Sequence, residues 1–267
     1  IDFHEMGKDS TYYFEPSPKS MHSPLIPAAS YAFNRTLATY HAAALDALGS
    51  LYYTGENFDN FSPVYGSTYP DFHGAVGVTV EQASSRGRVQ ESVNGPLTFP
   101  FTIRNHVAIG LGTVRGAVAE HQKLFDLQKQ FFQSALKQAG QQPVKSFVFG
   151  DAHDPALTRH LLELLLLHRI EVHALSAPVT VDGRRFEPGS AYVVHAAQPQ
   201  FRLVHSIFAE TPPIDGDVFY GSTSYAIAPA YGLAFAGSTG RLATGDRVQA
   251  VPTAHGGVVG GQAAFAY

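Results

Sequence analysis

The spacing of apolar residues in the first part of the chain predicts one long helix between loops and strands. Ala, Leu and Tyr recur three and four residues apart from Ser30 to about Leu51, with Gly49 near the stop, as in an amphipathic helix. The β-branched run Val76 to Val80 predicts a buried strand that presents Glu81 at its C-terminal tip. Residues 1 to 4 are typical of the end of a buried strand.

Pro, Gly and Ser are frequent in the segments between these elements. The segment YFEPSPKSMHSPLIP predicts a long surface loop, and ENFDNFSPVYGSTYPDFHG predicts a second one. Loops on a rigid scaffold often carry functional residues. We therefore expect any active site in this half to combine strand ends with loop residues.

The second half alternates strand and helix patterns. A long helical pattern runs from about His106 to Gln138 and closes at Gly140. KSFVFG then predicts a strand, DPALTRHLLELLLLHRI a helix capped by Asp154, and EVHAL the next strand. FEPGSAYVVHA and PQFRLVHSIFA repeat the alternation, which favours parallel βαβ units and a small doubly wound α/β domain.

Composition narrows the class of protein. The 267 residues, 45% hydrophobic and 12% aromatic, can fill the core of one large or two medium domains. A net charge of -4 with 15% charged residues argues against binding to nucleic acid or to an anionic membrane. The absence of Cys excludes disulfides, thiolate metal sites and a thiol nucleophile. The longest apolar run, Leu161 to Leu167, contains Glu163 and is far shorter than the ~20 residues of a membrane span.

The first residues contain a possible metal ligand. Imidazole is the commonest zinc ligand, and its second nitrogen is normally held by a carboxylate or a carbonyl. Asp2 lies two residues before His4, hence on the same strand face, and could orient that ring. Glu81, partly desolvated, would have a raised pKa suited to a general base. The alternative interpretation is a satisfied buried histidine and an ordinary strand-end acid.

Three segments in order, DFHEMG, VYGSTYP and GAVGVTVEQAS, favour the first interpretation. Together they resemble the second half of the catalytic domain of zinc metallocarboxypeptidases, the carboxypeptidase A-like enzymes, in particular their large bacterial members. The resemblance implies that His4 is the third zinc ligand and Glu81 the general base and acid for a zinc-bound water. It also implies a mobile loop whose Tyr covers the substrate, with Tyr65 as the better candidate and Tyr69 as the weaker one.

The same resemblance implies that part of the site lies outside this sequence. The family's first two zinc ligands come from a His-x-x-Glu ahead of the Asp-x-His strand, and we expect them upstream of Ile1. Two His-x-x-Glu strings occur, at residues 160–163 and 168–171, but both follow Glu81 and lack small residues between His and Glu. We reject both, and expect His160 and Glu163 to form an exposed pair on a helix. Because a catalytic zinc takes three protein ligands, this chain alone should be inactive.

Other residues have structural interpretations. Arg86 is a candidate for binding an acidic group of the substrate, although loop arginines are commonly solvated. His73, before Gly74, is typical of a turn. GSTSYAIAP around Tyr225 lacks the frame of a serine nucleophile, and HGGVVGG lacks that of a phosphate loop.

The sequence thus predicts an α/β protein in three parts. The resemblance implies that residues 1–115 form the C-terminal half of a carboxypeptidase-like mixed-sheet domain, 116–140 a connecting helix, and 141–267 an accessory α/β domain that we expect to be truncated. The last part is similar to the glutamine-amidotransferase-like (flavodoxin-like) domain of the large bacterial relatives. Without Cys, that domain cannot be an amidotransferase and would serve a structural role or bind carbohydrate or peptide.

The leading hypothesis is a fragment of a secreted or periplasmic zinc carboxypeptidase-like hydrolase that acts on peptides. Both ends of the sequence, at Ile1 and at the apolar AAFAY, are expected to be cuts. In the complete enzyme zinc would polarise the scissile carbonyl and lower the pKa of its water to about 7. The alternative is a non-catalytic binding or scaffold protein with a degenerate carboxypeptidase-like domain. Exopeptidase, endopeptidase and amidase action all stay open.

Overall fold

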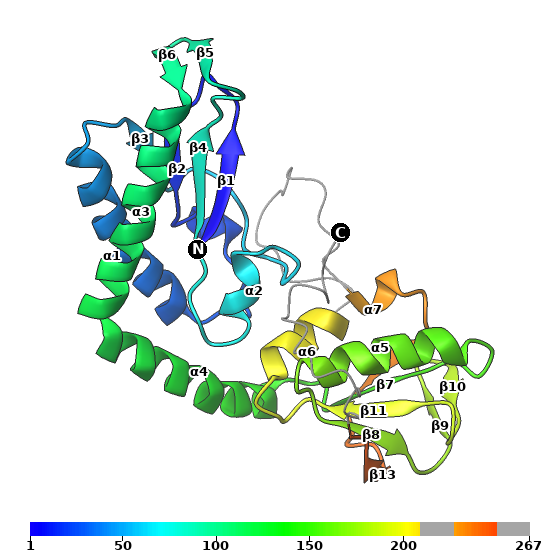
Figure 1. Cartoon of the computed structure of the whole chain (residues 1–267). Coiled ribbons are helices and arrows are strands. Elements are labelled where there is room, and N and C mark those ends of the chain that lie inside the picture. The colour runs from blue at the N-terminus through cyan, green and yellow to red at the C-terminus, as the bar shows by residue number, and fades with distance from the viewer. Residues whose placement is uncertain (209–226, 250–267) are drawn as a thin grey trace. The chain divides into compact units, whose positions relative to one another are not determined.

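The computed structural model describes residues 1–208 and 227–249 (Figure 1). The described chain divides into two compact units, Ile1–Phe131 and a second unit that begins at Phe132. Each unit combines helices with a sheet, so the α/β class is confirmed. The boundary between the two units, at Phe131 and Phe132, falls inside the helix α4 (His121–Gln141).

The first unit is built on a four-stranded mixed sheet in the order β1-β4-β2-β3. β1 (Asp2–Met6) runs parallel to β4 (Thr79–Ala83), and β4 runs antiparallel to β2 (Tyr12–Phe14). The short β3 (Tyr52–Tyr53) pairs in parallel with β2. β4 has a strand on each side and is buried along its whole length.

Helices cover one face of this sheet. α1 (Ala28–Asp46) and α3 (Phe99–Ala119) lie side by side (Figure 1). They approach closely because Gly112 and Gly116 of α3 face α1: a methyl group at Gly116 would lie 2.9 Å from a Leu37 side-chain carbon. The core beneath them combines both helices with β2 and β4, through Tyr12, Phe14, Phe33, Leu37, Leu45, Val78, Val80 and Ile109.

Short elements complete the unit. η1 (Lys19–Met21) and α2 (Thr68–Asp71) lie in the two Pro-rich segments. β5 (Val89–Ser92) and β6 (Gly95–Thr98) form an antiparallel hairpin ahead of α3.

Several sequence expectations are corrected in this unit. β1 is an edge strand that is largely exposed, not buried, because it has a neighbour on one side only among the described strands. Glu81 lies in the middle of β4 rather than at its tip, since the strand starts at Thr79 and continues to Ala83. The helical pattern from His106 to Gln138 is two helices, α3 and α4, that meet at Glu120.

The segment predicted as a first surface loop is also corrected, because much of it is buried. β2 occupies its beginning, and Glu15 is fully buried. The Glu15 carboxyl accepts hydrogen bonds from the side-chain amides of Asn34 and Asn60, each at 3.0 Å. This carboxyl therefore ties β2 to α1 and to the second loop.

The second unit contains a five-stranded sheet in the order β12-β7-β11-β8-β13. Its strands are β7 (Ser146–Phe149), β8 (Val172–Leu175), β11 (Tyr192–His195), β12 (Phe235–Ser238) and β13 (Thr244–Arg247). The remaining elements are α5 (Pro155–Leu167), the hairpin strands β9 (Val179–Val181) and β10 (Arg184–Phe186), α6 (Phe201–Phe208) and α7 (Ile227–Ala230). The capping role of Asp154 is confirmed, because its side chain accepts the Leu157 N–H.

The predicted parallel, doubly wound pairing is wrong for the described strands of this sheet. β7 and β8 do run in the same direction with α5 between them, but β11 lies between the two strands and pairs antiparallel with both. The reason is the tight turn at Asp182-Gly183, where both residues have positive φ, 48° and 74°. That turn closes the β9–β10 hairpin and sends the chain back as β11.

Two buried carboxyl groups should make the first unit sensitive to pH. Burial raises the pKa of Glu15, and it raises the pKa of Asp71 well above its ordinary value of 3.8. A carboxyl with a raised pKa holds its proton more tightly in the folded state. Its contribution is therefore fully present below the unfolded-state pKa and is lost as the pH rises through the folded-state pKa.

Asp71→Asn should weaken this pH dependence. The Asp71 carboxyl accepts the Gly77 N–H at 3.1 Å, and an asparagine oxygen can keep that bond without carrying a charge. We expect a melting temperature about 3 °C above the parent at pH 8 and close to it at pH 4. Thermal unfolding at both pH values checks this. Asp126→Asn, at an exposed position, is the control; equal effects of the two substitutions at pH 8 would contradict the prediction.

Candidate functional site

His4 and Glu81 are direct neighbours on adjacent parallel strands. The register of β1 and β4 pairs His4 with Glu81 and Asp2 with Thr79. Adjacent strands lie about 4.8 Å apart, and paired residues of a parallel ladder project to the same face. The two side chains are thus well within the ~10 Å over which they could share one metal-bound water.

Asp2 orients the His4 ring, as the two-residue spacing predicts. The His4 Nε2 atom lies 3.0 Å from the Asp2 Oδ2 atom. A carboxylate on one ring nitrogen leaves the other nitrogen as the metal-binding atom. In this arrangement Nδ1 of His4 is the atom that would ligate, and Asp2 is its orienting partner.

Glu81 lies in an environment that favours its protonated form. Its side chain is 7% exposed, and this burial raises its pKa above the ordinary 4.5; the nearby His4 lowers the pKa in part and Asp2 raises it. The raised pKa predicted from the sequence is confirmed in direction. A raised pKa makes a carboxylate a stronger base, and such a group can both accept and return a proton.

Aromatic residues that the sequence did not single out surround Glu81. Tyr13 of β2 is paired with Glu81 across the antiparallel β2–β4 ladder. The Tyr13 hydroxyl donates to the Asn57 carbonyl at 2.8 Å. The Glu81 charge contributes to the raised pKa values of both Tyr13 and Tyr53, for which burial is the main cause. Only the strand register shows this proximity, since these residues are remote from Glu81 in the sequence.

The loop that contains Tyr65 is held against the Asp2 carboxylate. A methyl group at Gly66 would lie 2.5 Å from Asp2 Oδ2, so this position has no room for a side chain. The next residue is fixed to β4: the Thr79 hydroxyl donates to Ser67 Oγ at 2.6 Å, and a methyl at Gly77 would lie 1.5 Å from the Ser67 carbonyl oxygen. Tyr65 directly precedes Gly66, the residue that approaches the Asp2 carboxylate.

Tyr69 lies farther along this segment, within α2. Its ring centroid is 4.4 Å from that of His73, and burial raises its pKa. His73 follows α2 in a turn, with its N–H donating to the Pro70 carbonyl, which confirms the turn expected from the sequence. The close approach to Asp2 concerns Gly66, the residue after Tyr65, and the preference for Tyr65 over Tyr69 stays a prediction.

Arg86 belongs to a different part of the surface. It lines a hollow of about 560 Å³ together with Glu5, Met6, Gly7, Lys8, Ser84 and Gln90. Neither His4, Glu81 nor Tyr65 lines this hollow, and Glu5 projects from the face of β1 opposite to His4. Arg86 thus lines a hollow to which the His4–Glu81 pair does not contribute, and its role toward a substrate stays a prediction.

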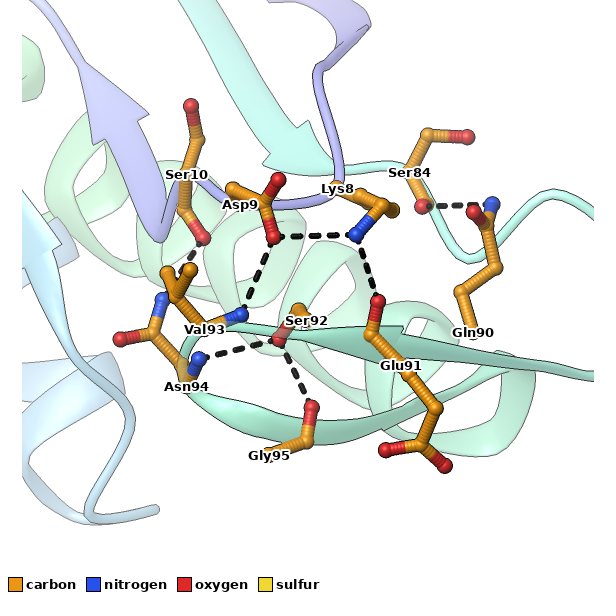
Figure 2. A network of polar contacts seen from close by, with 10 residues as sticks. All are labelled: Lys8, Asp9, Ser10, Ser84, Gln90, Glu91, Ser92, Val93, Asn94 and Gly95. Atoms are coloured by element: carbon orange, nitrogen blue, oxygen red, sulfur yellow. Dashed lines mark hydrogen bonds and ion pairs between the residues drawn. The ribbon is translucent and has the colours of Figure 1, made fainter.

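A network of polar contacts joins the β1–β2 turn to the β5–β6 hairpin (Figure 2), and its members Lys8, Ser84 and Gln90 also line the hollow. Lys8 Nζ donates to the Glu91 carbonyl at 2.7 Å, and Asp9 accepts the Val93 N–H at 3.0 Å. Gln90 donates to the Ser84 carbonyl at 3.2 Å. These bonds fix the hairpin beside the end of β1.

The residues present do not complete a zinc site by themselves. Among residues 1–208 and 227–249, no three His, Cys, Asp or Glu side chains are grouped so that they could hold a metal ion. His4 with its orienting Asp2 fits one ligand position, whereas a catalytic zinc takes three protein ligands.

The two His-x-x-Glu strings have other partners. Glu163 forms an ion pair with Arg159 at 2.7 Å, which corrects the expected His160–Glu163 pair; the guanidinium one turn away is the stronger partner. His168 is buried, with its Nδ1 atom 2.8 Å from the Leu164 carbonyl oxygen. Tyr225 and the HGGVVGG segment lie outside the described residues.

Comparison with family models, with curated proteins and with solved structures found no match to this chain. In the described part of the chain, no helix has the length and apolar character to cross a membrane.

Gly66→Ala should separate the Asp2 carboxylate from His4. The added methyl group would overlap with Asp2 Oδ2, whereas at Gly7 no atom lies within 4 Å of an added methyl group, which makes Gly7→Ala the matched control. Neither glycine has a positive φ, so backbone strain does not enter the comparison. We expect the ¹⁵N chemical shifts of the His4 ring to change in Gly66→Ala alone. Unchanged shifts would show that the loop does not hold Asp2 in place.

Proposed function

We propose that this chain carries half of the active centre of a zinc-dependent, carboxypeptidase-type hydrolase that acts on peptides. The observation that supports this proposal is the in-register pairing of His4 with Glu81 across two parallel strands. In this proposal His4 is a zinc ligand, and Glu81 transfers protons between a water molecule and the leaving amine.

The support for a ligand role comes from the surroundings of His4. Its Nε2 atom is held by the Asp2 carboxylate, which leaves Nδ1 free to bind a metal. An exposed histidine on an edge strand has no need of such an orienting partner for stability, since surface ion pairs contribute little. The arrangement is therefore better explained by a ligand than by a structural histidine.

The support for a proton-transfer role comes from the burial of Glu81. Strand β4 fixes the carboxyl in position, Glu81 is 7% exposed, and Tyr13 of β2 is its partner on the neighbouring strand. The raised pKa of Glu81 brings the group closer to neutrality, where a carboxyl is an efficient acceptor and donor. Tyr65, on the segment that Gly66 attaches to Asp2, is proposed to cover the bound peptide and donate a hydrogen bond to it.

The centre needs ligands from another part of the polypeptide. Two further zinc ligands are proposed to lie upstream of Ile1, so the chain by itself should have no activity. The second unit is proposed as an accessory domain, and the complete protein as a secreted or periplasmic one; both proposals rest on the family resemblance alone.

A non-catalytic binding protein is the second candidate function. It is favoured by a row of exposed apolar residues on α3, which suits a binding surface and needs no metal: Phe99, Ile103, Val107, Leu111, Val114 and Val118. The two candidates differ in their requirement for Glu81, because a binding protein does not depend on proton transfer.

Glu81→Gln should abolish catalysis in the protein translated with its upstream coding sequence. Loss of a general base costs about 10²- to 10⁴-fold in rate, and glutamine keeps the shape of the side chain. We expect kcat for a peptide with a free C-terminus to fall by this factor, while zinc content measured by atomic absorption is unchanged. The parent should also lose activity on the acid side, in a titration with a pKa above 4.5, because Glu81 must be ionised to accept a proton.

Glu163→Gln is the matched control, since Glu163 is an exposed carboxylate on α5 that pairs with Arg159. It should retain full activity. A Glu81→Gln variant with parental activity would reject the hydrolase mechanism, and a protein that never binds zinc would favour the binding-protein candidate.

A further inference from the structure

A second pocket lies on the side of β4 that faces α3, away from Glu81. Gln82 follows Glu81 in β4, and successive side chains of a strand project to opposite faces of the sheet. The Gln82 side chain accepts a hydrogen bond from the Asn105 amide of α3 at 2.9 Å, and both residues line this pocket of about 240 Å³. Its other walls come from the β1–β2 turn, the segment between α1 and β3, and the β5–β6 hairpin. Among the described residues, its lining includes neither His4 nor Glu81.

The floor of the pocket is a chain of three buried polar side chains. The Ser50 hydroxyl donates to Asn105 Oδ1 at 2.8 Å, and the Asn105 amide donates in turn to Gln82 Oε1. The Gln82 amide donates to the Ala83 carbonyl at 3.2 Å. Ser50, Asn105 and Gln82 are 6%, 1% and 1% exposed. These bonds fix both amide groups in one orientation, in which each amide oxygen already accepts a hydrogen bond.

Each amide nitrogen of the floor keeps one donor for a ligand. A primary amide has two N–H groups. Within the described part of the chain, Gln82 Nε2 and Asn105 Nδ2 each donate one hydrogen bond. Because a buried N–H without an acceptor is costly, the floor favours a ligand that brings oxygen acceptors to it.

The pocket offers no charge to a ligand. None of the described residues that line it has an ionisable side chain. Arg104 reaches the Ser50 hydroxyl at 3.5 Å but is not one of the lining residues. The hollow beside Arg86 differs in this respect, since Lys8 and Glu5 line it. A charged ligand would lose hydration in the pocket without gaining a partner of opposite charge, so the lining suits an uncharged ligand.

The walls combine hydroxyl groups with an aromatic ring. Ser10 and Thr11 are half-buried, and their side-chain hydroxyls form no hydrogen bond with the described residues. Phe101 is half-buried, and Leu97 is 7% exposed. A ring compound with hydroxyl substituents matches both features, because its hydroxyls donate and accept while its C–H groups pack against apolar side chains.

The size of the pocket suits one ring. A cavity of about 150 Å³ holds benzene. The pocket, at about 240 Å³, therefore has room for one six-membered ring with polar substituents. An extended peptide would need a groove several residues long, at about 3.3 Å per residue.

Hydrogen bonds within the protein form this pocket in advance. The Asn94 side-chain amide donates to the Ser10 carbonyl at 3.3 Å, and the Ser92 hydroxyl donates to the Gly95 carbonyl at 2.7 Å (Figure 2). All four residues line the pocket. The hairpin is thus already held against the β1–β2 turn, which reduces the entropy cost of binding a ligand.

We propose that this pocket binds a single uncharged sugar ring. Gln82 and Asn105 donate hydrogen bonds to oxygens of the sugar, and Ser10 and Thr11 exchange hydrogen bonds with its hydroxyls. Phe101 packs against the C–H groups of the ring. The site goes beyond the proposed hydrolase function and does not depend on it, since the two share no lining residue.

An NMR titration of the 267-residue chain tests this proposal. The probes are D-glucose, D-galactose and D-mannose. We expect the side-chain NH₂ signals of Gln82 and Asn105 to shift and saturate with at least one of them, with Kd on the order of 1 mM. The corresponding uronate, in which a carboxylate replaces the CH₂OH group, should bind at least ~10-fold more weakly.

Three results of the titration would overturn the proposal. They are no saturable shift of the Gln82 and Asn105 signals with any of the three sugars, equal or tighter binding of the uronate, and tighter binding of the neutral peptide mimic N-acetylglycine methylamide. The last result would assign the pocket to a peptide ligand.

Two variants test the roles of the lining residues. Gln82→Met removes the amide at similar side-chain length and should weaken binding of the sugar by about 3- to 10-fold. Phe101→Ala removes the aromatic wall and should weaken binding by at least ~5-fold. Phe99→Ala is the matched control, because Phe99 lies on the same helix, is 50% exposed and does not line the pocket.

The Phe101 and Phe99 pair keeps the test independent of folding. Neither residue belongs to the core beneath α1 and α3, so both variants should retain the parental amide spectrum of β2 and β4. Equal affinity of Phe101→Ala and Phe99→Ala for the sugar would remove this pocket as its binding site.

Discussion

The parallel pairing of β1 with β4 is the constraint on which the candidate site depends. A parallel ladder in this register brings a histidine and a glutamate that are 77 residues apart in sequence to the same face at the distance of neighbouring strands. A shift of one residue would turn one side chain to the opposite face of the sheet. The register is stabilised on the other side of β4 by β2, whose Tyr12 and Phe14 contribute to the core beneath α1 and α3.

Around this pairing, the molecule uses buried polar groups to hold the loops. Glu15 joins two asparagines from different segments, and Ser67 bonds to Thr79 of the central strand. Buried polar groups of this kind are costly unless they are satisfied, and they therefore specify one arrangement of the loops. The segment next to Asp2 takes its position from these bonds and from two glycines, Gly66 and Gly77, that leave no space for a side chain.

The first unit exposes a row of large apolar side chains on α3, and its edge strand β1 is largely exposed. A helix normally buries its large apolar residues and exposes its small and polar ones. In α3 Ile109 is buried in the core, but the positions next to α1 are glycines, which allow close packing, and six large apolar residues from Phe99 to Val118 face outward. The close approach of α1 and α3 at Gly112 and Gly116 thus decides which face of α3 is buried.

Local sequence signals determined the helices, several strands and the chemical candidates of this protein. The periodicity of α1, the cap at Asp154 and the Asp-x-His spacing act over a few residues, so they can be recognised without knowledge of the fold. The turn at Asp182-Gly183 was a signal of the same kind that the strand-helix-strand interpretation overlooked. Only the tertiary structure decided that β11 lies between β7 and β8, that Glu81 is central in its strand, that Tyr13 and Tyr53 lie near it and that Arg86 lines a hollow with Glu5 and Lys8. These features depend on strand order and register, which arise from contacts between residues that are distant in the sequence.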